Sequence, residues 1–239
     1  ELKFEYNFKL SLMIISFLLI SLGLLSSTLH LGHPERAWRS FSQWRSSWLS
    51  REGLAAIITY IPLMFFYLFW YLDLGLSKYL LFTSSILSLI TIYCTGQMYA
   101  TLKTIPAWNN VFVTPIYIIN AISMGALCLY CLTRLYETKI SQLYELTVIS
   151  LILCLFFKLI YWYYIRNKFT STANSATGLG KINDVSFFEG PHTGKNFLTT
   201  EMINKIKKEK ANFLRLCFII LSCVLPMYMI VQEATLIID

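Results

Sequence analysis

Charged residues are scarce in this sequence. Asp, Glu, Lys and Arg make up 14% of its 239 residues, whereas hydrophobic residues make up 56%. A typical soluble domain has about 25% charged residues, so this composition excludes an ordinary water-soluble fold. Several apolar runs exceed the roughly 20 residues that a helix needs to cross a bilayer. The chain is therefore predicted to be an integral membrane protein.

Ligands for electron carriers are also scarce. The three histidines, His30, His33 and His192, all lie in or at the edge of polar connectors, whereas a haem inside a helix bundle takes ligands that project inward from the helices. Cys128 and Cys131 form a C-x-x-C with no second pair nearby, which disfavours a zinc or iron–sulfur site. All six cysteines lie in apolar segments and are interpreted as small hydrophobes. We expect no haem and no metal in this chain.

The positive charge of the chain is moderate and lies between the apolar runs. The formal net charge is +7, which is small for a nucleic-acid binder, so no nucleic-acid partner is expected. Lipid headgroups or an acidic partner protein are the better match.

Six apolar segments predict membrane spans, so the expected fold is an all-α, polytopic transmembrane helix bundle forming a single membrane domain over residues 1–239. The segments are residues 9–29, 53–72, 79–102, 112–135, 142–165 and 213–231. Residues 166–212 are predicted to form a long extramembrane loop, in which residues 201–210 form a basic amphipathic helix along the headgroups. Because the sequence opens with Glu1 rather than Met, we allow for a cleaved leader or an earlier helix.

The connector between the first and second spans, residues 30–52, concentrates the polar chemistry of the chain. It holds two histidines, four arginines, three tryptophans and two glutamates. His30 can accept a proton near neutral pH, and Glu52 is a second acceptor at the start of a helix. The structural alternatives are a water-facing helix-end cap for His30 and a charge favoured by the helix dipole for Glu52.

The other connector residues allow both docking and lipid contact. Arg36 and Arg39 suit an acidic face of a partner subunit or lipid phosphate, since guanidinium pairs with either. Trp38, Trp44 and Trp48 could stack on a quinone ring, but an interfacial tryptophan belt is the more ordinary interpretation. Within the spans, Gln97 and Asn120 are predicted to form hydrogen bonds between helices.

Three motifs in order carry a resemblance to a known family. The residues are His30-Leu31-Gly32-x-Pro34-x-Arg36-Ala37 with Ser50-x-Glu52, then Tyr99 with Thr104-x-Pro106-x-Trp108 and Thr114-Pro115, and then Thr177-Gly178-Leu179-Gly180 with Gly190-Pro191-His192-Thr193-Gly194 and Glu201-Met202. Together they resemble the membrane-anchor subunit of the dimethyl sulfoxide reductase family, the third motif being similar to a bacterial branch. The likeness extends from about residue 10 to residue 226.

The resemblance implies a haem-free subunit in the bacterial inner membrane that oxidises a quinol, either menaquinol or ubiquinol. It would anchor an iron–sulfur subunit and a molybdopterin catalytic subunit. His30 and Glu52 fall where the family has a histidine and a glutamate associated with quinol binding. Supporting or docking residues would be Gly32, Pro34, Arg36, Trp38 and Arg39, and secondary candidates in the long loop would be His192 and Thr193. Family members usually have eight spans, whereas this sequence shows six.

Sidedness and function each leave alternatives open. The odd-numbered connectors are the basic ones, which the positive-inside rule places in the cytoplasm. Docking of an exported catalytic subunit would produce the same count, and we favour that arrangement. A purely structural anchor and a small secondary transporter remain the other function classes, although a transporter predicts broken helices and mid-membrane polar groups, of which the sequence shows few.

Overall fold

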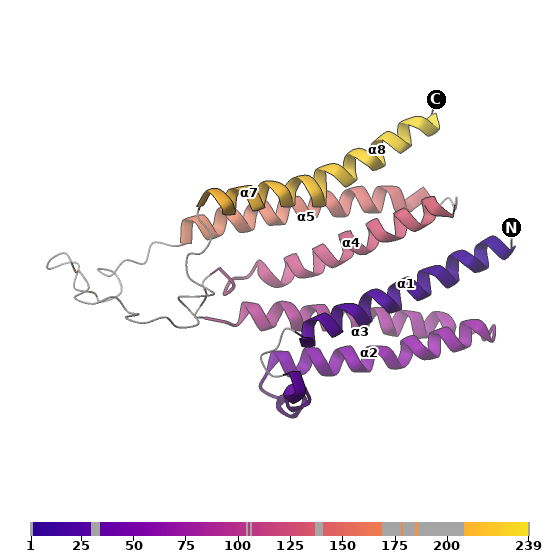
Figure 1. The fold of residues 1–239 in the computed structure, drawn as a ribbon, viewed down its shortest axis with the longest axis horizontal. Helices are drawn as coiled ribbons and strands as arrows, with labels where there is room; N and C mark the ends of the chain where they lie inside the picture. The colour runs from indigo at the N-terminus through magenta and orange to yellow at the C-terminus, as the bar shows by residue number, and fades with distance from the viewer. Residues whose placement is uncertain are drawn as a thin grey trace. The chain divides into compact units, whose positions relative to one another are not determined.

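The computed structural model describes residues 2–29, 34–103, 105, 107–136, 141–168, 178, 185 and 208–238. Every regular element in these ranges is helical (Figure 1), which confirms the predicted all-α class. In chain order the elements are α1 (Leu2–Leu29), the 3-10 helix η1 (Pro34–Gln43), α2 (Trp48–Tyr71), α3 (Ser77–Ala100), α4 (Val113–Leu135), α5 (Ser141–Lys168), α7 (Lys208–Ile219), the π-helical turn η4 (Ile220–Val224) and α8 (Leu225–Ile238).

Six helical stretches are long and apolar enough to cross a membrane, which confirms the predicted number of spans. They are Tyr6–Leu29, Trp48–Tyr71, Ser77–Ala100, Val113–Leu135, Gln142–Arg166 and Lys210–Gln232. Between 11% and 28% of each stretch is buried inside the chain. Most of the apolar surface therefore faces outward, as expected for helices solvated by lipid or covered by other subunits.

The main difference from the predicted boundaries concerns the second span. It begins at Trp48 rather than at residue 53, so Glu52 belongs to the first turns of α2. The last span also begins earlier, with α7 at Lys208. The predicted amphipathic helix over residues 201–210 lies mostly outside the described residues.

The chain forms two compact units, Glu1–Lys158 and Leu159–Asp239. In the first unit, α2 and α3 form an antiparallel hairpin joined by a tight turn. Asp73 takes the left-handed conformation (φ 55°), its N–H donates to Trp70 O (3.2 Å), and the N–H of Leu74 donates to Phe69 O (2.8 Å). This is a Schellman ending with aspartate in the place that glycine usually takes. It returns the end of α3 to the start of α2.

Helices α3 and α4 approach closely at Gly96. A β-carbon on Gly96 would lie 2.8 Å from Thr114 Cα, so the contact requires glycine. Pro115 fits the first turn of α4, where no backbone N–H is needed. On the adjacent side, the Tyr99 ring stacks on Tyr117 (5.7 Å, 12°) and meets the edge of Trp108 (5.1 Å). The Gly96 contact sets the spacing of the two helices.

Helix α1 is attached to α2 along one side. The Tyr67 hydroxyl donates to Met13 O (3.1 Å), and Ser21 Oγ lies 3.0 Å from the Tyr60 hydroxyl. Near the start of α1, Ser11 bonds the hydroxyl of Tyr136, which follows α4. These polar contacts fix α1 at two edges in a bilayer, where the hydrophobic effect does not hold helices together.

Polar groups also connect α4 with α5. Cys154 Sγ donates to Asn120 Oδ1 (2.7 Å), and Ser123 Oγ donates to Ser150 O (3.1 Å). The predicted interhelical hydrogen bond of Asn120 is thus confirmed. Gln97, by contrast, makes no side-chain hydrogen bond to any described residue.

The second unit contains the end of α5 and the helix from α7 to α8. The Trp162 ring meets the edge of Phe218 (5.8 Å), and the Arg215 guanidinium lies 5.7 Å from the Trp162 centroid. The π-helical turn lies next to Pro226, which has no N–H and would crowd a carbonyl of an ideal α-helix. Leu225 N–H bonds Ile220 O instead, one residue further back than in an α-helix.

We predict that Gly96→Ala lowers the stability of the chain by about 1–3 kcal/mol, because the added methyl group overlaps backbone rather than a flexible side chain. The measurement is the midpoint of thermal unfolding in detergent. Gly23→Ala is the matched control, since nothing lies within 4 Å of a β-carbon at Gly23. Equal midpoints for the two variants would contradict the close approach of α3 and α4.

Candidate functional site

The connector end of the first unit, defined as residues 34–52 together with residues 93–118, carries the polar side chains of the candidate site. The 3-10 helix η1 folds back onto α2, where the Phe41 ring lies against Gly53; a β-carbon there would be 2.8 Å from Phe41 Cε1. Arg51 joins the connector to the helix, since its Nε donates to Trp44 O (2.9 Å) and its Nη2 to Arg45 O (2.6 Å). The start of α2 is thereby fixed in position.

The three tryptophans of the connector each lie beside an arginine. The guanidinium carbon is 5.5 Å from the ring centroid for Arg39 over Trp38, 5.3 Å for Arg45 over Trp44 and 4.3 Å for Arg51 over Trp48. Trp38 is 66% exposed, and the first two pairs lie at the surface, where cation–π contacts contribute little. The third pair is half-buried at the start of α2.

Glu52 points from the first turns of α2 toward α3. Its carboxylate Oε1 accepts a hydrogen bond from Thr95 Oγ1 at 2.8 Å, and the residue is half-buried. The charge of the neighbouring Arg51 is directed to connector carbonyls and to Trp48 instead. No described residue forms a salt bridge with Glu52. A carboxyl group without a counter-charge at a membrane boundary is costly and marks a functional site by default.

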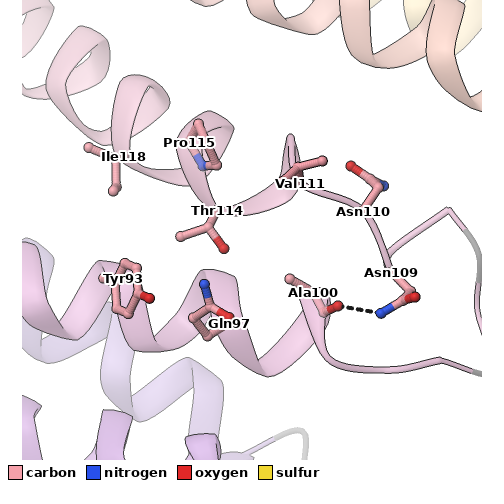
Figure 2. Close-up of a pocket in the computed structure, with 9 residues that line it drawn as sticks. All are labelled: Tyr93, Gln97, Ala100, Asn109, Asn110, Val111, Thr114, Pro115 and Ile118. Carbon is pink, nitrogen blue, oxygen red and sulfur yellow. Dashed lines mark hydrogen bonds between the residues drawn. The ribbon is translucent and has the colours of Figure 1, made fainter.

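A polar cleft of about 550 Å³ lies where α3 ends and α4 begins (Figure 2). Figure 2 shows the side chains of Gln97 and Thr114 pointing toward each other across it, and the Asn109 amide donating to Ala100 O (2.7 Å). The Thr114 hydroxyl is buried and has no hydrogen-bond partner within the described part of the chain. The lining of this cleft consists of Tyr93, Gln97, Ala100, Asn109, Asn110, Val111, Thr114, Pro115 and Ile118.

The cleft and Glu52 lie on different faces of α3 but are connected by an aromatic contact. Tyr93 lines the cleft, and its ring meets the edge of Trp48 (6.0 Å). Trp48 is one helical turn before Glu52 on α2, so the two share a helix face. Glu52 itself does not line the cleft. The arrangement thus has a polar cleft on one side of α3 and a half-buried carboxyl group beside it.

The predicted site residues are only partly covered by the described ranges. His30, Gly32, His192 and Thr193 lie outside them, and Pro34 begins η1. Arg36 is exposed and 3.7 Å from Glu35, and Arg39 is exposed beside Trp38. Arg36, Trp38 and Arg39 are therefore available to water, lipid or a partner. Among the residues that the structure describes, no group of three or more His, Cys, Asp or Glu side chains could hold a metal ion.

Two participants were not identified from the sequence as members of a site. Thr95 lies inside an apolar run, where nothing in its surroundings indicates a carboxylate partner. Gln97 was interpreted as a structural hydrogen-bonding residue, whereas it lines the cleft. A hydroxyl and an amide one turn from the end of a predicted span were the available signal.

Comparisons with known proteins agree on one family. The pattern of the family "DMSO reductase anchor subunit (DmsC)" matches residues 5–237. The chain is similar to the C-type subunit of a sulfite dehydrogenase from Allochromatium vinosum, with 29% identity over 237 residues, covering 91% of this chain and 71% of the relative. It is also similar to the C-type component of the anaerobic dimethyl sulfoxide reductase from Haemophilus influenzae, with 26% identity over 123 residues, covering 50% of this chain and 44% of the relative. No solved structure matches the sequence.

The Glu52–Thr95 contact can be tested by infrared difference spectroscopy. The carboxyl band of Glu52 is the one lost in Glu52→Gln, and we predict that Thr95→Val shifts it, because a carboxyl oxygen loses its hydrogen-bond donor. Thr91→Val is the control, since that hydroxyl bonds Leu87 O of its own helix (2.9 Å). An unshifted band in Thr95→Val would show that the contact does not exist in the membrane.

Proposed function

This chain belongs to the DMSO reductase anchor subunit family and is the membrane anchor subunit of an oxidoreductase, and we propose on that premise that it oxidises a quinol at the connector end. The electrons would pass to an iron–sulfur subunit and from there to a molybdopterin catalytic subunit. The single observation that carries the proposal is the half-buried Glu52 carboxyl group, which has Thr95 as a hydrogen-bond donor and, within the described residues, no cation as a partner.

Oxidation of a quinol to a quinone breaks two O–H bonds and releases two protons and two electrons. The electrons leave to the partner subunit, so the protons need acceptors at the membrane–water boundary. A carboxylate and an imidazole can both act at physiological pH. We assign these roles to Glu52 and His30, which flank the same connector in the sequence.

The polar cleft is the proposed binding place of the quinol ring. Its volume of about 550 Å³ lies in the range of small-molecule sites, which combine apolar walls with a few convergent polar groups. Pro115 and Ile118 supply apolar surface, while Gln97 and Thr114 face each other and can bind ring oxygens. The unpartnered Thr114 hydroxyl supports this assignment, because a buried polar group without a partner is costly unless a ligand satisfies it.

Glu52 does not line the cleft, so the proposal separates binding from proton acceptance. The ring is held between α3 and α4, and the proton reaches Glu52 at the adjacent face of α3, with water as the carrier over any gap. The two functions can therefore be separated kinetically. Changes in the cleft should affect the KM for quinol, whereas changes at Glu52 should affect kcat.

The exposed connector surface is the proposed contact with the iron–sulfur subunit. Arg36 and Arg39 are exposed there beside Trp38, and arginine and tryptophan are enriched in protein interfaces. If the catalytic subunit is exported, this surface faces the outside of a bacterial inner membrane. The names of the two relatives mention sulfite in one case and dimethyl sulfoxide in the other. We therefore assign the choice of terminal substrate to the catalytic subunit, not to this chain.

We predict that Glu52→Gln and His30→Leu each lower kcat for quinol-linked reduction at least about 100-fold, because each removes a proton acceptor. The measurement is the rate at which quinol reduces the iron–sulfur centres of the purified, assembled complex. Glu35→Gln is the control, because Glu35 is an exposed acid of the same connector. Undiminished quinol oxidation by both variants in an assembled complex would show that the chain is a structural anchor without a quinol site.

We predict that Gln97→Leu raises the KM for quinol about tenfold and leaves kcat within about twofold, since it removes a binding group that does not accept a proton. Thr101→Val is the control; that hydroxyl lies outside the cleft and bonds Gln97 O of its own helix (2.9 Å). An unchanged KM for Gln97→Leu would remove the quinol ring from the cleft, while the assignment of Glu52 would be tested separately by kcat.

A further inference from the structure

A second cleft lies in the opposite half of the first unit, away from the connector end. Its volume is about 780 Å³, and residues of α1, α2, α3 and α4 line it. On α2 the lining residues run from Leu63 to Trp70, and on α3 from Leu81 to Ser88. Glu52 and Gln97 are separated from them by several helical turns. This cleft, called here the inner cleft, therefore has no part in the proposed quinol chemistry.

The inner cleft exists because α1 is held at its edges. Tyr67 holds α1 on the α2 side through Met13 O (3.1 Å), and Tyr136 holds it beyond the end of α4 through Ser11 and an edge contact with Phe8 (5.7 Å). The residues beneath it are small. Ser84, Ser85 and Ser88 lie on α3, and a β-carbon on Gly125 of α4 would meet nothing within 4 Å.

The hydroxyl donors of the inner cleft are already used. Ser84 and Ser85 each donate to Leu81 O (2.8 Å), and Ser88 donates to Ser84 O (2.9 Å). A bound water needs two to four polar partners, and a quinone ring needs donors for its carbonyl oxygens. The walls, with Leu12, Leu63 and Leu129 among them, offer apolar contact instead. The chemistry of the lining favours a hydrocarbon chain over water or a quinone ring.

One end of the inner cleft has the features of a headgroup site. Lys9 of α1 and Trp70 in the last turn of α2 line it there, and lysine and tryptophan are typical of the membrane–water boundary. Basic pockets between transmembrane helices bind anionic lipid headgroups. Leu19, Leu81 and Met124 are lining residues that remain exposed, so a hydrocarbon chain can enter from the bilayer.

We propose that the inner cleft binds one phospholipid with an anionic headgroup, its acyl chain lying between α1 and the serines of α3 and its phosphate near Lys9. The lipid supplies the packing that α1 lacks against α3. A void of this size without an occupant would leave its lining atoms without dispersion contacts. The lipid is a structural ligand of the anchor and takes no part in electron transfer.

The test is native mass spectrometry of the assembled, delipidated complex after incubation with phosphatidylglycerol or with phosphatidylethanolamine. We expect one tightly held phosphatidylglycerol on the wild-type anchor and its loss in Gly125→Leu, whose side chain fills the open space. Gly23→Leu is the matched control, because Gly23 is also open but does not line the cleft. If Gly125→Leu fails to assemble, Cys128→Phe fills the same cleft from an exposed lining position.

The headgroup part is tested with Lys9→Gln. We expect the preference for phosphatidylglycerol over phosphatidylethanolamine to fall about fivefold, the effect of one lysine near an anionic surface, and Lys78→Gln, an exposed lysine outside the cleft, to leave it unchanged. Equal lipid binding by the wild type and both filling variants would overturn the proposal. So would a quinone as the released ligand, or equal binding of the two phospholipids by the wild type.

Discussion

The contact between α2 and α3 at Glu52 and Thr95 is the interaction on which the site depends. In an apolar environment a carboxyl group must be paired, hydrogen-bonded or protonated. Here a single hydroxyl donor holds it at 2.8 Å, while the adjacent Arg51 is bound to connector carbonyls. Glu52 therefore keeps the capacity to exchange a proton, which a salt bridge would suppress. The Schellman turn at Asp73 and the close approach at Gly96 set the register that brings these groups together.

The number of spans and the fold class could be predicted from the sequence, because bilayer thickness imposes a length that apolar runs must satisfy. The beginning of α2 could not. Residues 48–52 are too polar to count as a span, yet Arg51 bonds to the preceding connector and extends the helix into them. Glu52 was identified from its position in a motif. Its partner Thr95 depends on the register of two helices, which hydropathy does not encode.

The polar cleft illustrates the same limit. Thr114 and Pro115 belong to a motif that could be recognised, but only the approach of α3 and α4 at Gly96 makes Thr114 face Gln97. A glycine inside an apolar run gives no such indication by itself. The two halves of the first unit also differ in a way that composition conceals. Unpartnered polar groups lie at the connector end, whereas the hydroxyl donors of α3 in the other half are turned back to their own helix.

The central claim, that quinol binds at the connector end, is tested most directly by photo-crosslinking. The assembled complex would be illuminated with a photoreactive quinone analogue, and the labelled peptides would be identified by mass spectrometry. The account predicts labels on the last turns of α3 and on residues 109–118, displaced by excess natural quinol. Displaceable labels confined to the partner subunits or to the half of the bundle around Leu63–Trp70 would contradict it.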